Sequence, residues 1–307
     1  MSKTVWNRYF FGLAVITSLA LMVWITGAKA QNAAAQGAIN GDWTASLSKD
    51  NGKIQLNLAR KSDRGGKHQH GQSYEFSELE GLSRDQAVND GAVNFSLVRE
   101  AGRVDFEGSF QNGRGSGTFR FTANASFISA MKSRGFDFES NSYDDERHPQ
   151  SRLFTAAMVN VTTALADDLA SAGFNLQTED LFKAAIFKVD GQFMREMKAS
   201  GFNNLGMEDL VKARIFKIDA EFVRRVSQMG FDKEPFESLV KMQIFKVTPE
   251  FITEVRNEGL TDLQIEEIVK LRIFKIDAEF IRNAKSQGTP IDVESLVQRR
   301  IGVARRN

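Results

Sequence analysis

The stretch RIFKIDAEFVRR at residues 214–225 returns almost unchanged at residues 272–283 as RIFKIDAEFIRN. Two looser copies, AIFKVDGQFMRE at 185–196 and QIFKVTPEFITE at 243–254, keep the same spacing. An isoleucine recurs every 29 residues, at Ile186, Ile215, Ile244 and Ile273. A glycine follows each isoleucine 15 residues later, at Gly201, Gly230, Gly259 and Gly288. A repeat of this length is typical of an array of small stacked units.

One unit is predicted to be a helix, a turn and a second short helix. Thr248 can accept a hydrogen bond from the N–H groups of a helix start, and Pro249 suits the first helical position. Aspartate takes the place of this threonine in other units, at Asp190, Asp219 and Asp277. Gly259 is expected to end the first helix, because glycine adopts left-handed backbone at the least cost. A second helix is expected at about 263–271.

Short helices of this kind need neighbours, because an isolated helix of two or three turns is marginal in water. We expect the Ile-Phe-Lys linker to bury its two large apolar side chains between units. The segment NASFISAMKSRGF at 124–136 aligns with DGQFMREMKASGF at 190–202, which places the first such helix near Asn124. The sequence therefore predicts an α-helical repeat domain of 29-residue helix-turn-helix units over residues 123–307.

Two sets of lysines repeat with the array. The first is Lys183, Lys212, Lys241 and Lys270, and each has a glutamate four residues before it. Glutamate ahead of lysine at this spacing favours an ion pair within one helix, so we expect this set to stabilise its own helices. The second set, Lys188, Lys217, Lys246 and Lys275, lies in the linkers and has no such partner in the sequence. These four are the candidate partner-binding residues; the alternative is ordinary solvated surface.

The N-terminal residues 1–30 have the form of a secretory signal peptide. Lys3 and Arg8 precede an apolar run over residues 9–27. Ala28 and Ala30 form a small-x-small site that predicts cleavage before Gln31. The alternative is an uncleaved membrane anchor, because the run is just long enough to cross a bilayer. Either way the bulk of the chain is predicted to be exported, periplasmic or secreted, with residues 31–41 as a linker.

Composition narrows the function. The chain contains no cysteine, which excludes disulfides, thiol nucleophiles and cysteine-ligated zinc. Removal of Lys3, Arg8 and Lys29 with the signal leaves 37 basic against 39 acidic residues, a net charge of about −2. A nucleic-acid-binding protein should show a basic surface, so this balance argues against such a partner.

Residues 42–122 follow a different pattern, in which apolar and polar residues alternate. Trp43, Ala45 and Leu47 are one example, and Ile54, Leu56 and Leu58 are another. Alternation of this kind is typical of half-buried antiparallel strands, and turn sequences such as Asn112-Gly113 separate the runs. The sequence predicts a small antiparallel β-sandwich or bent sheet at 42–122. The fold class is therefore α+β, with a β-domain before the repeat array.

Several motifs in both domains resemble an uncharacterised bacterial exported family. They are Gly41-Asp42-Trp43, IQLNL at 54–58, FEGSFQNGRGSGTFRF at 106–121 and VTPEFITEVRNEG at 247–259. Similar segments resemble the extracytoplasmic tails of some antirepressor-type membrane zinc metallopeptidases, the class that senses β-lactams. The peptidase motif His-Glu-x-x-His does not occur in this chain. The resemblance thus implies an accessory role in the envelope and transfers no catalytic residue.

No enzymatic constellation stands out in the sequence. His68, His70 and His148 are the only histidines, and a polar loop with incidental histidines is favoured over a metal site. No Gly-x-Ser-x-Gly motif frames a serine nucleophile. The sequence therefore predicts no enzyme and no cofactor, but an interaction module that binds another envelope protein through the array. The alternative is a small-ligand sensor or accessory protein of an envelope signalling system that uses the β-domain, around Trp43. For these aromatic residues we favour a role in the core over a role in ligand binding.

Overall fold

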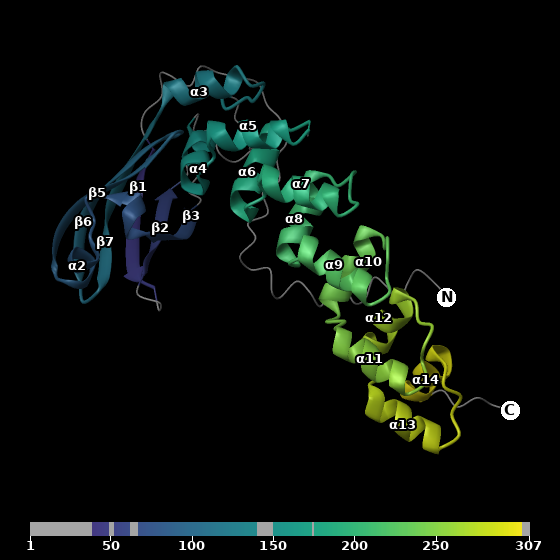
Figure 1. The fold of residues 1–307 in the computed structure, drawn as a ribbon. Helices are drawn as coiled ribbons and strands as arrows, with labels where there is room; N and C mark the ends of the chain where they lie inside the picture. Colours follow the sequence, from purple (N-terminus) through teal and green to yellow (C-terminus); the bar gives the residue numbers. More distant parts are fainter. Residues whose placement is uncertain (1–38, 49–51, 62–66, 140–149, 174, 303–307) are drawn as a thin grey trace. The chain divides into compact units, whose positions relative to one another are not determined.

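The computed structural model describes residues 39–48, 52–61, 67–139, 150–173 and 175–302 (Figure 1). The chain forms two compact units, Met1–Asn160 and Val161–Asn307. The first contains an antiparallel sheet, and the second consists of consecutive helices. The predicted α+β class is confirmed.

The first unit is built on one seven-stranded antiparallel sheet with the order β3-β2-β1-β7-β6-β5-β4. The first and last long strands, β1 and β7, pair side by side in the middle of it. The structure therefore has the bent sheet and not the sandwich. The strands are β1 (Ile39–Leu47), β2 (Lys53–Lys61), β3 (Lys67–Glu75), β4 (Leu79–Glu80), β5 (Gly91–Arg99), β6 (Gly102–Gln111) and β7 (Arg114–Ala123).

An aromatic cluster around Trp43 forms the core on one face of the sheet. Trp43 is only 1% exposed, and its ring contacts those of Phe95, Phe106 and Phe110 at centroid distances of 5.3, 6.2 and 5.8 Å. A Cβ atom on Gly115 would lie 2.6 Å from the indole ring. A Cβ atom on Gly108 would lie 2.8 Å from it, so these two glycines of the 106–121 segment leave room for the tryptophan.

Helices complete the first unit. They are the 3-10 helix η3 (Phe76–Glu78), α2 (Arg84–Val88), α3 (Ala125–Lys132) and α4 (Ser151–Val159). On α4, the Phe154 ring lies 5.7 Å from that of Phe119 and 5.4 Å from that of Phe121. Because α4 packs on the sheet in this way, the first compact unit continues to Asn160, beyond the predicted end of the β-domain at residue 122.

The second unit repeats the predicted helix-turn-helix. Helices two apart in the chain pack together, as α5 does with α7, α6 with α8, and α10 with α12, so first helices and second helices form two rows. The helices are α5 (Thr163–Ser171), α6 (Thr178–Phe187), α7 (Gly191–Ala199), α8 (Met207–Ile215), α9 (Ala220–Gln228), α10 (Phe236–Ile244), α11 (Pro249–Asn257), α12 (Ile265–Ile273), α13 (Ala278–Ser286) and α14 (Val293–Arg300).

The predicted helix starts and stops are confirmed. Thr248 accepts a hydrogen bond from the N–H of Phe251 at 3.2 Å, and Asp219 accepts one from Phe222 at 2.7 Å. At the other end of α9, Gly230 adopts φ +93°. Its N–H donates to the carbonyl of Ser227, and the N–H of Phe231 donates to the carbonyl of Val226. These two hydrogen bonds form the Schellman motif.

The linkers correct one expectation. The isoleucines of the Ile-Phe-Lys segment are not buried between units: Ile186 is 46% exposed and Ile215 51% exposed. The phenylalanines are half-buried, and the residue after each lysine is buried instead, as Ile218 is. The reason is a second Schellman turn, in which the N–H of Ile218 donates to the carbonyl of Ala213 at 2.7 Å. That turn directs the residue after the lysine into the core.

Candidate functional site

The first set of lysines is paired across units. Lys212 bonds Glu237 at 2.8 Å, Lys241 bonds Glu266 at 2.5 Å, and Lys270 bonds Glu294 at 2.6 Å. Lys183 bonds Glu208 in the same way. The hydrogen bond to Glu237 raises the pKa of Lys212. The glutamate partner therefore comes from the following unit and not from four residues earlier in the same helix, although Lys183 and Lys212 also lie 3.7 and 3.4 Å from Asp180 and Asp209 of their own helices. We call these four lysines the paired row.

The second set comprises the predicted partner-binding residues, and all four are exposed. Each lies at the second-helix end, where the backbone is left-handed, with φ between 52° and 54°. Within the described part of the chain, their side chains form no hydrogen bond or ion pair, which agrees with the absence of a sequence partner. We call Lys188, Lys217, Lys246 and Lys275 the unpaired row.

Both helix ends of a unit have left-handed backbone, but they carry different residue types. The first helix ends on glycine, the residue that this conformation favours, as at Gly230. The second helix ends on lysine in the same conformation. A Cβ atom in this region costs roughly 1–2 kcal/mol. The chain therefore keeps a lysine side chain at a backbone position that would favour glycine, and it does so in four successive units.

Side chains of the next unit bond the turns that carry Lys217, Lys246 and Lys275. Arg272 Nε donates to the carbonyl of Phe245 at 3.0 Å, and its guanidinium lies 4.7 Å from the ring centroid of Phe251. Arg300 donates to the carbonyls of Phe274 and Lys275 at 2.9 and 2.8 Å. These bonds occupy backbone carbonyls at the helix ends, while the lysine side chains stay in solvent. Ile186 and Ile215 are exposed two residues before Lys188 and Lys217, so this half of the row combines positive charge with apolar surface, whereas Ile244 and Ile273 are half-buried.

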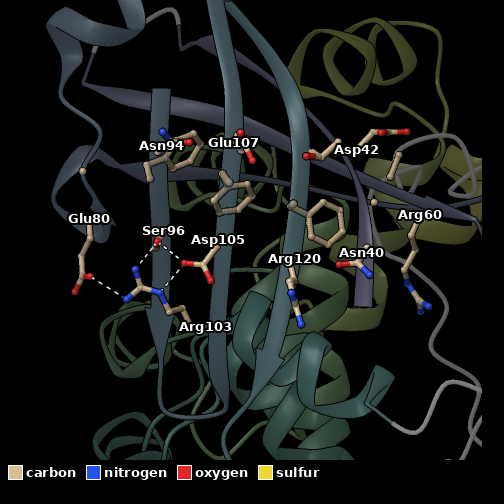
Figure 2. A pocket seen from close by; sticks show the side chains of 17 residues that line it. Asn40, Asp42, Arg60, Glu80, Asn94, Ser96, Arg103, Asp105, Glu107 and Arg120 are labelled. Atoms are coloured by element: carbon tan, nitrogen blue, oxygen red, sulfur yellow. Dashed lines mark hydrogen bonds and ion pairs between the residues drawn. The ribbon is translucent and has the colours of Figure 1, made fainter. Parts of the chain in front are cut away.

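A second feature lies on the polar face of the sheet, opposite the aromatic core. A hollow of about 1380 Å³ extends over it and is drawn in Figure 2. The strand register aligns two rows of side chains across β5, β6, β7 and β1. The carboxylate row is Asn94, Glu107, Thr118 and Asp42. The guanidinium row is Ser96, Asp105, Arg120 and Asn40.

A hydrogen-bonded network closes one side of the hollow. Arg103 donates from Nε to Asp105 Oδ1 at 2.6 Å, and from a terminal nitrogen to Ser96 Oγ at 2.7 Å. Ser96 donates to the same carboxylate oxygen at 2.7 Å, and Glu80 lies 3.5 Å from the guanidinium. Desolvation opposes the charge on Asp105, but the hydrogen bonds outweigh it and lower the pKa of that carboxyl. This wall is pre-ordered by its own bonds.

Sequence reasoning missed this hollow. The signal that could have indicated it is the polar positions of the alternating strands, where charged residues such as Asp42 and Arg120 occur among serines and threonines. The sensor hypothesis placed the ligand near Trp43 instead, a residue that the structure buries among the core aromatics. Only three-dimensional register brings the polar residues together, because they come from strands far apart in the chain.

The predicted cleavage site lies outside the described residues, and two of the three histidines lie on the sheet. Ala28, Ala30 and Gln31 lie outside the described residues, as does the 9–27 segment. Among the helices that the structure describes, none has the length and apolar character to cross a membrane. His68 and His70 lie on β3, and His148 is outside the described residues. Across the described ranges, no group of three histidine, aspartate or glutamate side chains gathers in a way that could hold a metal ion.

The chain matches no protein-family model and shows no significant similarity to a curated protein or a solved structure. The resemblance to exported bacterial proteins and metallopeptidase tails therefore stays a prediction.

Proposed function

We propose that the helical array is a protein-binding module of the bacterial envelope, and that its partner binds along the unpaired row. The observation that supports this most is the left-handed lysine at the end of each second helix. Structure alone would favour glycine there, as at the first-helix ends. A lysine retained four times at some conformational cost is best explained by a use for its side chain.

The contrast with the paired row supports the same proposal. Lys212 and its equivalents are neutralised by glutamates of the next unit, whereas the unpaired row keeps its charge exposed. A regular line of cations suits an extended partner, which is how repeat arrays present their binding surfaces. The partner should be acidic, because complementary charge speeds association and selects partners. Exposed Ile186 and Ile215 add apolar contact.

The proposed setting follows from the N-terminal signal and the resemblance described above. The mature protein would be exported and would act without a cofactor, without nucleic acid and without turning over a substrate. If residues 9–27 are retained, they would tether the module to the membrane. This places the protein among accessory components of the envelope.

The experiment uses two quadruple variants of the unpaired row. The first changes all four lysines to glycine, which removes the side chains and suits the left-handed backbone. The second changes all four to glutamate. Each variant and the wild type are expressed in the native host and crosslinked in the envelope fraction, and the captured proteins are compared. We expect both variants to lose the proteins that the wild type captures, with unchanged circular dichroism.

A matched control changes Lys212 and Lys241 of the paired row to methionine, and capture should persist. Retention of the same proteins by the glycine variant would remove the unpaired row from the interface. If the wild type captures nothing while the purified chain hydrolyses a peptide or glycan, the proposal fails in favour of an enzyme.

A further inference from the structure

Three exposed charged side chains, Asp42, Glu107 and Arg120, line the hollow on the sheet beside the hydrogen-bonded wall. Within the described residues, the carboxylates of Asp42 and Glu107 and the guanidinium of Arg120 form no hydrogen bond or ion pair, although the charge of Arg120 helps to lower the pKa of Asp105 on the adjacent strand. Their neighbours Arg103 and Asp105 are fully engaged with each other and with Ser96. The wall of the hollow is thus satisfied internally, whereas its floor offers two exposed carboxylates and one exposed guanidinium with no hydrogen-bond partner among the described residues.

The register sets the spacing of these charges. Asp42 and Glu107 both lie opposite Thr118, one from each neighbouring strand, so their Cα atoms are about 10 Å apart, two strand spacings. Arg120 lies two residues along β7 from Thr118, about 7 Å away. Figure 2 shows Glu107 and Asp42 at one end of the hollow and Arg120 toward the other. Two carboxylates, which can bind a positively charged group, therefore lie near one guanidinium, which can bind a negatively charged group.

We propose that this hollow binds a small amphoteric molecule, a short peptide of about two residues. Its ammonium would lie between Asp42 and Glu107 above Thr118, because an ammonium offers three donors and these groups supply acceptors. Its carboxylate would lie on Arg120, which can bind a carboxylate through two parallel hydrogen bonds. An extended chain spans about 3.3–3.6 Å per residue, so two residues cover the distance between the rows.

Other ligand classes fit the hollow less well. A dianion would meet two carboxylates at one end, and a polyamine would leave Arg120 unused. A metal ion needs ligands that converge at about 2–2.6 Å, whereas the two free carboxylates come from strands separated by a third. Basic amino acids share the chemistry of the peptide, because the side-chain ammonium of lysine lies about 7 Å from its carboxylate. The experiment separates these two sources.

Binding is measured on the purified full chain by isothermal titration calorimetry at low salt. The probes are alanyl-alanine, alanyl-lysine and free lysine, with N-acetylated and C-amidated forms of the dipeptides. We expect a free dipeptide to bind and each blocked form to bind at least about tenfold more weakly, since each loses a charged partner. Tighter binding of lysine than of both dipeptides would identify a basic amino acid as the source. In either case the class of ligand stands.

The variants Asp42→Asn, Glu107→Gln and Arg120→Gln keep side-chain size and remove one charge each. We expect each to weaken the dipeptide at least about tenfold. Arg114→Gln is the matched control, because Arg114 lies on the same face of the same strand, exposed and outside the hollow, and it should bind normally. The proposal is overturned if no probe binds at up to about 10 mM, if blocked dipeptides bind equally, or if all three variants bind as the wild type does. These results are independent of the array, so they do not decide its proposed function.

Discussion

Two rows of lysines repeat with the same 29-residue period, but the fold uses them in opposite ways. In the paired row, Lys212 and its equivalents join successive units through glutamates. In the unpaired row, Lys217 and its equivalents lie on left-handed turns, and their exposed side chains have no partner among the described residues. The paired row therefore belongs to the stacking of the array, and the unpaired row is available to a partner.

The comparison teaches that recurrence alone does not identify a functional residue. Both rows recur equally well, and both consist of one residue type. What separates them is the backbone conformation beneath the side chain and the presence of an opposite charge in the next unit. A recurring residue whose conformation is unfavourable and whose charge is unanswered is the better candidate for binding.

The largest expected effect comes from removing the anchor beneath the unpaired row. Ile218 is fully buried directly after Lys217, and we expect Ile218→Ala to lower the free energy of unfolding by about 2–5 kcal/mol. Ile215→Ala, three residues earlier and half exposed, should change it by less than about 0.5 kcal/mol. Urea unfolding followed by circular dichroism measures both. Equal losses would mean that the isoleucine of the linker is part of the core after all.

A smaller effect tests the conformational contrast itself. We expect Lys217→Gly to raise the free energy of unfolding by about 0.5–1 kcal/mol, because relief of the left-handed strain exceeds the extra entropy of glycine in the unfolded chain. The mirror change Gly230→Lys puts the strain at a first-helix end and should lower it by about 1–2 kcal/mol. Thermal melts of the two variants give the signs. A loss of stability in Lys217→Gly would show that the lysine stabilises its own turn, which would remove the main support for the binding role.

The smallest effect concerns the paired row and its charge. Both Lys212 and Glu237 are more than one-third exposed, so solvent screening limits the loss in Lys212→Met to under about 0.5 kcal/mol. The hydrogen bond to Glu237 raises the pKa of Lys212. The stabilisation by this ion pair is therefore fully present below about pH 10.4, the usual pKa of lysine, and is lost as the pH rises through the raised pKa. Urea melts from neutral to alkaline pH should show the gap between wild type and variant closing. Lys217→Met is the control and should show no such pH-dependent gap; a gap of the same size there would erase the distinction between the rows.

Much of the array could be predicted because its signals are local. Asp219 binds an N–H three residues ahead, and Gly230 ends its helix by its own conformation. The strands could also be predicted, since alternation along each strand marks the face that is buried. The partner of Lys212 could not be predicted, because the sequence offers two glutamates: Glu208 is four residues before it, and Glu237 is 25 residues after it. Only the stacking of units brings the second one within 2.8 Å.

The sequence by itself determined the period of the array, the start and end of its helices, the alternating strands and the position of the unpaired row. These features depend on residues within a few positions of one another, where backbone geometry fixes the distances. The tertiary structure alone decided the pairing of β1 with β7, the partners of the paired row, the exposure of Ile215 and the polar hollow around Thr118. Each of these depends on segments far apart in the chain, which come into register only when apolar surface is buried between them.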